Sequence, residues 1–168
     1  MHKKSLAVLG LGSNLGRKSG NLADAVREIS RFCEVARVSS VYKTASLLRD
    51  SQDGYFNLCM LVRTDFSPEN LLTAVKNLEK VMGRVNTGRW YTRLIDIDII
   101  DFDRTVLTLP QLNLPHIEMQ NRSFVLYPMA EIYPDYVHPV SCQNIHDMIK
   151  NIKDDLGITR LGVCVWRL

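Results

Sequence analysis

The chain has 168 residues, of which 46% are hydrophobic and 23% are charged. This composition matches an ordinary folded domain and gives no support to a disordered or fibrous class, and no stretch approaches the length of a transmembrane helix. The length predicts a single domain over residues 1–168. A net charge of +3 is too small for a dedicated nucleic-acid binder, so the placement of the charges has to indicate the partner.

The cysteines and the N-terminus both point to a cytoplasmic protein. The four cysteines are scattered, without a C-x-x-C pair or zinc-finger spacing, which predicts free thiols in a reducing compartment. The apolar run Leu6–Leu11 is short and lacks a small-residue cleavage pattern. It therefore favours a first buried strand over a signal peptide.

The first half of the chain alternates between predicted strands and one predicted helix. The strand over Leu6–Leu11 ends in a glycine turn, and Asn21 is in position to cap the helix that follows. Alternating apolar residues then predict strands over Glu34–Lys43 and Tyr55–Thr64. The polar stretch between these two strands predicts a loop long enough to form a wall of a binding site.

The second half completes a recognisable order of elements. Ser67-Pro68 begins a helix whose apolar stripe stops at Gly83, and Ile95–Phe102 forms the next strand. The order strand, helix, strand, strand, helix, strand predicts an α+β fold, a ferredoxin-like βαββαβ sandwich with helices on one face of its sheet. The C-terminal third, with a helix near Asn144–Ile152 and a weak last strand, is interpreted as an elaboration of that domain.

The most informative stretch is the last of these strands, where Asp96 and Asp98 alternate with isoleucines. On a strand, alternate side chains share a face about 6–7 Å apart, so the two carboxylates repel each other unless a cation lies between them. A pair of Mg²⁺ ions with phosphate oxygens would satisfy both carboxylates. A solvated outer face is the alternative, but the flanking isoleucines indicate a central, partly buried strand and favour the metal interpretation.

A basic stretch precedes the aspartates. From Lys80 through Arg84, Arg89 and Arg93 there is no acidic residue, and glycine, asparagine and threonine make the segment loop-like. Arginine forks on such a loop suit a polyphosphate, although the arginines alone are equally compatible with a solvated or nucleic-acid-facing loop. The neighbouring carboxylates favour nucleotide phosphates.

Two further groups are weaker signals by themselves. Tyr55 and Asn57 share a strand face and suit a flat heterocycle, but core packing around a satisfied amide explains them equally well. His116, with Arg122 and Phe124, offers another binding group, although a structural histidine and plain core are the simpler interpretation.

Assembled in order, these pieces resemble the 6-hydroxymethyl-7,8-dihydropterin pyrophosphokinase family over about Leu6 to Ile152. The most specific segment is Arg89-Trp90-Tyr91-Thr92-Arg93-Leu94-Ile95-Asp96-Ile97-Asp98, although the family usually has Gly-Pro where this chain has Tyr91-Thr92. The other matching pieces are Gly12-Ser13-Asn14-Leu15-Gly16, Tyr55-Phe56-Asn57, Glu79 with Gly83-Arg84, Leu114-Pro115-His116 and Asn121-Arg122-Ser123-Phe124.

The resemblance implies transfer of the β,γ-diphosphate of ATP to the pterin hydroxymethyl group, with AMP as the other product. It implies that Asp96 and Asp98 bind two Mg²⁺ ions and that Arg84 and Arg93 act on the transferring group. It also implies pterin contacts from Thr44, Leu47, Tyr55, Asn57, Trp90 and Phe124. The implied ATP contacts are Glu79, Arg89, Ile99, Asn113, His116 and Arg122.

Two other hypotheses stay open at this point. A diverged relative could bind another pterin or nucleotide, as a loop departure such as Tyr91-Thr92 suggests. A non-catalytic ferredoxin-like module could bind single-stranded RNA through sheet aromatics, although unmetalled aspartates on the sheet would repel its phosphates. We expect a monomer whose partners are ATP and the pterin, with no nucleic acid and no membrane.

Overall fold

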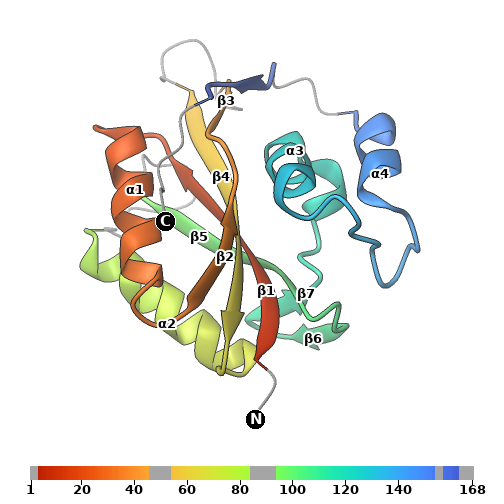
Figure 1. The fold of residues 1–168 in the computed structure, drawn as a ribbon, viewed down its shortest axis with the longest axis horizontal. Helices are drawn as coiled ribbons and strands as arrows, with labels where there is room; N and C mark the ends of the chain where they lie inside the picture. Colours follow the sequence, from red (N-terminus) through yellow and green to blue (C-terminus); the bar gives the residue numbers. More distant parts are fainter. Residues whose placement is uncertain (1–3, 46–53, 84–93, 154–156, 163–168) are drawn as a thin grey trace.

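The computed structural model describes residues 4–45, 54–83, 94–153 and 157–162, and its arrangement is shown in Figure 1. These residues form an antiparallel sheet, a small separate hairpin and four α-helices. In chain order the elements are β1 (Ser5–Ser13), α1 (Lys18–Ile29), β2 (Glu34–Val38), β3 (Tyr42–Thr44), β4 (Tyr55–Thr64), α2 (Pro68–Val81), β5 (Asp96–Phe102), β6 (Leu107–Leu109), β7 (Leu112–Leu114), a 3₁₀ turn (Met119–Asn121), α3 (Ser123–Ile132), α4 (Ile145–Asn151) and β8 (Thr159–Arg160).

The main sheet has the strand order β5-β1-β4-β3-β8, with β2 also paired to β4. Every described pairing in it is antiparallel. β5 therefore lies at the end of this order, and the expectation of a central strand was wrong. Its isoleucines are nevertheless buried, because helices cover both faces of the sheet and α2 packs against β5.

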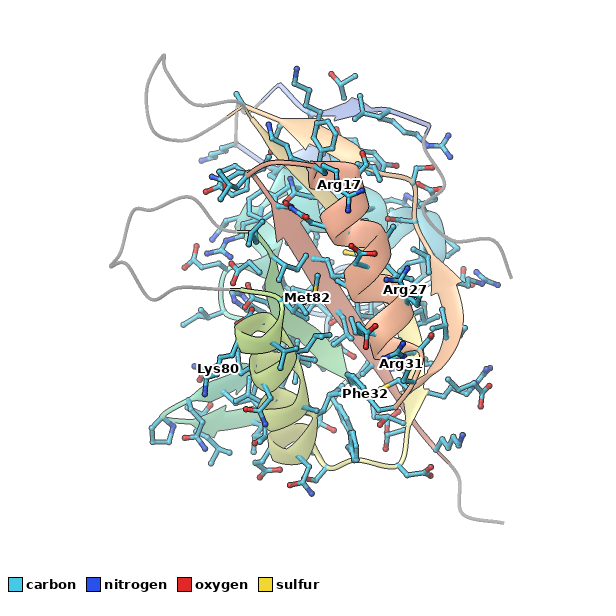
Figure 2. The ribbon with its side chains drawn as sticks, turned by 90° about the vertical axis from the view of Figure 1, so that its left-hand side faces the viewer. Arg17, Arg27, Arg31, Phe32, Lys80 and Met82 are labelled. Atoms are coloured by element: carbon cyan, nitrogen blue, oxygen red, sulfur yellow. The ribbon has the colours of Figure 1, made fainter. Side chains whose placement is uncertain are left out.

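Two cores lie on opposite faces of the sheet. α1 and α2 cover one face, where Leu9, Leu22 and Ile97 belong to the same buried cluster. Figure 2, turned by a right angle, shows these two helices side by side in front of the strands. α3 covers part of the other face, in a second cluster with Cys59 and Leu126. The expectation of helices on one face only was thus wrong, because the strands are apolar on both faces and the C-terminal third supplies the second cover.

The two long helices begin differently. α2 begins as predicted, with Pro68 at its first position and the Ser67 hydroxyl accepting the Asn70 N–H at 3.2 Å. α1 begins at Lys18, so the prediction that Asn21 caps it was wrong. The Asn21 amide instead donates to the Ser13 hydroxyl at 3.1 Å and to the Leu15 carbonyl at 2.8 Å. It ties the glycine turn to the helix.

The predicted strand over Glu34–Lys43 is split into β2 and β3. Ser39 lies between them, where its N–H donates to the Cys59 carbonyl and its hydroxyl accepts the Cys59 N–H, each at 2.9 Å. The register of β2 against β4 also shifts between Val35 and Arg37. A side chain that takes a ladder position in this way lets the strand bend without leaving the Cys59 N–H unpaired.

The C-terminal third adds α4 and β8 as predicted. Asn144 caps α4 through its side-chain oxygen, which accepts the Asp147 N–H at 3.0 Å. β8 pairs with β3 at the far end of the sheet from β5. Of the helices that the structure describes, none combines the length and the apolar character needed to cross a bilayer.

Candidate active site

The paired carboxylates lie on β5 as the alternation predicts. Ile97 and Ile99 are buried in the core beneath α1 and α2, so Asp96 and Asp98 point to the opposite face, where both are half-buried. The Asp98 side chain is 36% exposed, which leaves its carboxylate accessible. The shared face of the two aspartates is confirmed, and the strand holds them on a rigid element.

A strip of bare backbone runs beside the carboxylates. On β1, Gly12 pairs with Asp96 of β5 and Gly10 pairs with Asp98 of β5. On its other side, Gly12 pairs with Asn57 of β4. A Cβ atom at Gly12 would come within 3.0 Å of the Asn57 amide oxygen. Gly12 therefore leaves room for the Asn57 amide next to Asp96. At Gly10 the room is taken by the Ile100 side chain, which an added Cβ would approach to 3.1 Å.

The amide beyond this strip is held in place by β3. The Asn57 amide donates to the Thr44 hydroxyl at 3.1 Å, and both side chains are buried. Tyr55 lies two residues before Asn57 on the same strand face and is half-buried. At Gly54 an added Cβ would collide with the Thr44 carbonyl, so this glycine lets the two strands close together. Thr44, Tyr55 and Asn57 are thus brought together as expected.

The outer edge of β5 is covered by two side chains of α2. The Glu79 carboxylate is 1% exposed and accepts the Ile97 N–H at 2.6 Å and the Lys76 ammonium at 2.9 Å. Burial raises the pKa of Glu79, and the Lys76 charge and the Ile97 N–H oppose that rise. The Lys76 ammonium also donates to the Ile97 carbonyl at 2.7 Å and lies 3.5 Å from the Asp98 carboxylate.

His116 is attached to the same edge. The backbone N–H of His116 donates to the Ile100 carbonyl at 2.8 Å, and the ring Nδ1 accepts the Glu118 backbone N–H at 3.2 Å. Burial lowers the pKa of His116, while the negative charge of Asp98 opposes this shift. The neutral ring with Nδ1 accepting carries its proton on Nε2, where it can donate to an anion. Asn113 is exposed on the neighbouring strand β7.

Arg122 and Phe124 flank the start of α3, on the face of the sheet that carries the aspartates. The Arg122 guanidinium lies over the Phe124 ring, 5.7 Å from its centroid. Both side chains are half-buried, and Phe124 packs against the core beneath α3. The ring is therefore held between the protein interior and a cation, with part of its surface open.

Five residues expected at the site lie outside the described part of the chain, namely Leu47, Arg84, Arg89, Trp90 and Arg93. The described residues on either side of residues 84–93 lie close together. A Cβ at Gly83 would come within 3.2 Å of the Leu94 side chain. Gly83 and Leu94 are therefore neighbours next to the start of β5.

Sequence reasoning missed the glycine strip and Lys76. The spacing of Lys76 and Glu79, three residues apart on a helix, was a visible signal for an ion pair. Its position beside Asp98 was not visible, because it depends on how α2 meets the end of the sheet. Gly10 and Gly12 gave the signal of two glycines inside a strand, which marks a close approach by another group.

The donor set fits Mg²⁺ that is shared with a phosphate ligand. Among the described residues no group of three or more histidine, cysteine, aspartate or glutamate side chains could hold a metal by itself. Mg²⁺ usually takes one or two carboxylates and fills its shell with water and phosphate oxygens. Asp96 and Asp98 would supply that part of the shell.

The molecule is a mixed α/β fold in which one sheet face carries a carboxylate pair, two glycines and a buried amide. These are the groups expected in an enzyme that brings a phosphorylated ligand next to a planar heterocycle. Residues 8–134 match the sequence profile of 7,8-dihydro-6-hydroxymethylpterin-pyrophosphokinase, abbreviated HPPK. The chain belongs to this family of enzymes.

Relatives named 2-amino-4-hydroxy-6-hydroxymethyldihydropteridine pyrophosphokinase cover most of the chain. One from Synechocystis is 37% identical over 148 residues, which is 87% of this chain and 75% of that protein. One from Methylorubrum extorquens is 34% identical over 157 residues, which is 92% of this chain and 98% of that protein.

Longer proteins contain a similar part. The folic acid synthesis protein FOL1 of Dictyostelium discoideum is 36% identical over 135 residues, and the chain spans 20% of its length. The crystal structure of wild-type Plasmodium falciparum HPPK-DHPS with STZ-DHP has a TM-score of 0.70 at 16% identity. That comparison covers 88% of this chain and 43% of the Plasmodium chain, and it supports the fold alone.

Proposed function

We propose that this chain transfers the β,γ-diphosphate of ATP to the hydroxymethyl oxygen of 6-hydroxymethyl-7,8-dihydropterin and releases AMP, as a step of folate biosynthesis. The observation that carries the proposal is the row across one sheet face, in which the Asp96 carboxylate, Gly12 and the Asn57 amide follow one another on adjacent strands. In this row, carboxylates suited to metal-bound phosphate lie two strands away from an amide suited to a heterocycle, so the two substrates would lie next to each other. Family membership supplies the identity of the two substrates.

The pterin would lie against the β3–β4 end of this row. Asn57 and Thr44 would hydrogen-bond the edge of the ring, and Tyr55 and Phe124 would contact its faces. The Asn57–Thr44 hydrogen bond at 3.1 Å orients the amide before any ligand arrives. Preorganised donors of this kind lower the entropy lost on binding. Leu47 and Trp90 are proposed to complete this part of the site.

The nucleotide would lie along the edge of β5. His116 can donate from Nε2 to a phosphate, Arg122 adds a positive charge, and Asn113 and the backbone of Ile99 would contact ATP. Glu79 accepts a hydrogen bond from the Ile97 N–H, so it would contribute to ATP binding by holding the backbone of this edge in position. Arg89 is proposed as a further ATP contact.

Asp96 and Asp98 would hold two Mg²⁺ ions, which when bound neutralise phosphate charge and polarise the phosphorus under attack. The protein's part is to position the hydroxymethyl oxygen in line with the β-phosphorus and to stabilise the charge that develops. Arg84 and Arg93 are proposed to stabilise the transferring group. We assign no general base, because phosphoryl transfer depends more on positioning and charge than on proton removal.

The arginines in and next to α1 favour small-molecule partners over RNA. Arg17 directly precedes the helix, Arg27 lies in its last turn and Arg31 follows its end, as Figure 2 shows. Arg27 pairs with Asp24 at 2.8 Å, and Arg31 pairs with Glu28 at 2.7 Å. Two of the positive charges along this helix are thus balanced by neighbouring carboxylates, which weakens the face as a basic stripe for a nucleic acid.

The organisation of the molecule is also part of the proposal. The order β5-β1-β4 followed by β2 and β3, with α1 and α2 over one face, supports a ferredoxin-like sandwich with a C-terminal elaboration. We place residues 1–168 in one domain that acts as a monomer in the cytoplasm. The free thiols of Cys33, Cys59 and Cys142 suit that compartment.

The test is formation of AMP from ATP and Mg²⁺ with and without 6-hydroxymethyl-7,8-dihydropterin. We expect AMP only when the pterin is present, and we expect Asp96→Asn and Asp98→Asn each to lower kcat by at least about a hundredfold, since each removes charge at the transferring phosphate. Asp135→Asn, at an exposed acid beyond α3, is the matched control and should retain wild-type activity. Wild-type rates in both β5 variants would refute the metal assignment.

A further inference from the structure

We propose that Lys76 is a positioning residue that serves as a built-in counter-cation for Asp98, stabilising the acidic pair before a divalent cation binds and weakening the binding of that cation. The inference rests on the proposed metal site at Asp96 and Asp98. It concerns a residue of α2, outside the strand that carries the aspartates.

The Lys76 ammonium is held by three acceptors. It donates to the Glu79 carboxylate at 2.9 Å, to the Ile97 carbonyl at 2.7 Å and to Asp98 Oδ1 at 3.5 Å. The Lys76 side chain is 34% exposed, so most of its length is packed against the fold. Its charge therefore has a fixed position.

Glu79 fixes that position from the inside. Its carboxylate is buried and also accepts the Ile97 N–H at 2.6 Å. Moving the Lys76 ammonium into solvent would remove a charge-assisted hydrogen bond from this buried carboxylate, which is costly. The lysine is anchored on one side by Glu79 and the Ile97 peptide and reaches Asp98 on the other.

The charge next to Asp98 has opposite effects on two states of the site. Without a divalent cation, the repulsion between Asp96 and Asp98 is partly offset by the ammonium. With a divalent cation bound to Asp98, the same ammonium is a like charge a few ångströms away and opposes binding. Lys76 therefore stabilises the site without a divalent cation and destabilises the site with one, so it makes the free energy of cation binding less favourable.

The matched test is Lys76→Gln, which removes the charge and keeps a side chain that can donate to Glu79 and to the Ile97 carbonyl. Mn²⁺ binding is followed by the electron paramagnetic resonance signal of the free ion, with an α,β-methylene analogue of ATP present, because that analogue cannot release its diphosphate. We expect the Mn²⁺ dissociation constant to fall about three- to tenfold, the size expected for one half-exposed neighbouring charge. Lys80→Gln, one turn along α2 at an exposed position, should bind Mn²⁺ as the wild type does.

Thermal unfolding separates this role from a merely structural one. Without divalent cation, Lys76→Gln should unfold at a lower temperature than Lys80→Gln, and saturating Mg²⁺ should raise its Tm by more than it raises that of the wild type. A variant that only lost packing would keep the wild-type gain with Mg²⁺. Unchanged or weaker Mn²⁺ binding in Lys76→Gln, or an equal Tm gain, would overturn the proposal.

Two further experiments keep the inference separate from the proposed function. If Asp98→Asn binds Mn²⁺ as tightly as the wild type, the metal site itself is wrong; if binding needs Asp98 but ignores Lys76, only the counter-cation is wrong. Should Lys76→Gln fail to fold, the ¹⁵Nζ resonance of Lys76 in the wild type, assigned by its loss in Lys76→Arg, gives the answer. It should shift as Mg²⁺ saturates Asp98, and an unchanged resonance would refute the proposal.

Discussion

Three glycines shape the site because they lack a side chain. Gly12 makes room for the Asn57 amide beside Asp96, and Gly10 makes room for the Ile100 side chain. Gly54 does the same for the contact between β3 and β4, since its missing side chain makes room for the Thr44 carbonyl. These positions are sensitive to the smallest possible addition.

Gly54→Ala should be destabilising. The added Cβ would meet the Thr44 carbonyl oxygen and carbon, which belong to the backbone and cannot rotate away. We expect the free energy of unfolding to fall by about 1–3 kcal/mol, the usual cost of overpacking, and the KM for the pterin to rise because Thr44 moves. Urea denaturation and steady-state kinetics would measure the two effects.

Gly20→Ala is the control for this prediction. Gly20 is inside α1, and an added Cβ there would meet only the flexible Arg17 side chain. In a helix this change should raise stability by about 0.5–1 kcal/mol. Equal effects of the two substitutions would show that the Thr44 carbonyl does not limit the Gly54 position.

At the level of elements, α2 links the core beneath it to the edge of β5, where the nucleotide is proposed to lie. It buries Leu71 and Val75 against the sheet and presents Lys76 and Glu79 to the edge of β5. The position of these two side chains depends on where the helix starts. Its N-cap therefore has consequences at a distance from the cap itself.

Ser67→Ala should weaken α2 without touching the site. The substitution removes the oxygen that accepts the Asn70 N–H, and we expect a loss of about 0.5–2 kcal/mol in the free energy of unfolding. Ser67→Asp, which keeps an acceptor and adds a charge that the helix N-terminus favours, should stay near the wild type. Chemical denaturation of the three proteins measures this, and equal losses in both variants would exclude a capping role.

Elements defined by their own residues were predictable, and elements defined by their neighbours were not. Ser67-Pro68 marked the start of α2, and the alternation around Asp96 and Asp98 placed both aspartates on one face. The end position of β5 could not be predicted, because a strand buried under two helical layers has the same apolar pattern as a central one. α3 was not predicted, because Pro128 lies inside it and a proline is unusual in the interior of a helix.

The site shows the same division. Tyr55, Asn57 and Thr44 could be grouped from strand alternation and the family resemblance, and the Asn57–Thr44 hydrogen bond joins two of them. The third acceptor of Lys76 and the attachment of His116 to Ile100 depend on tertiary packing between segments that local patterns do not relate. The roles of the five residues in undescribed segments stay predictions.

For the molecule as a whole, burial of ionisable groups makes stability depend on pH. His138 is buried beyond α3, and its Nδ1 accepts the N–H groups of Val140 and Ser141, each at 3.2 Å. Burial lowers the pKa of His138. Burial raises the pKa of Asp101, whose carboxylate accepts the Tyr136 hydroxyl at 2.9 Å. As the pH falls, His138 therefore lowers the free energy of unfolding, whereas Asp101 raises it.

We expect His138 to lower stability as the pH falls below about 6.5, the pKa of an unfolded histidine. In that range the unfolded chain binds a proton that the folded His138 does not, so the free energy of unfolding decreases with falling pH. Protonation would also place a donor at Nδ1 against two N–H groups. Urea denaturation of the wild type and of His138→Gln at pH 7.5 and pH 5 measures this.

The comparison isolates His138 from the other titrating groups, because they are shared by both proteins. The wild type should be the more stable protein at pH 7.5, and its advantage should shrink at pH 5. An advantage that is the same at both pH values would show that His138 does not titrate between them.

The covered edge of β5 also bears on how the molecule avoids self-association. A strand at the end of a sheet presents unpaired N–H and C=O groups that can template a strand from another molecule. Here Glu79 and Lys76 occupy both polar groups of Ile97, and the His116 N–H occupies the Ile100 carbonyl. These contacts, which line the proposed nucleotide side, thus also block intermolecular β-pairing, so losing them would expose the sheet to aggregation.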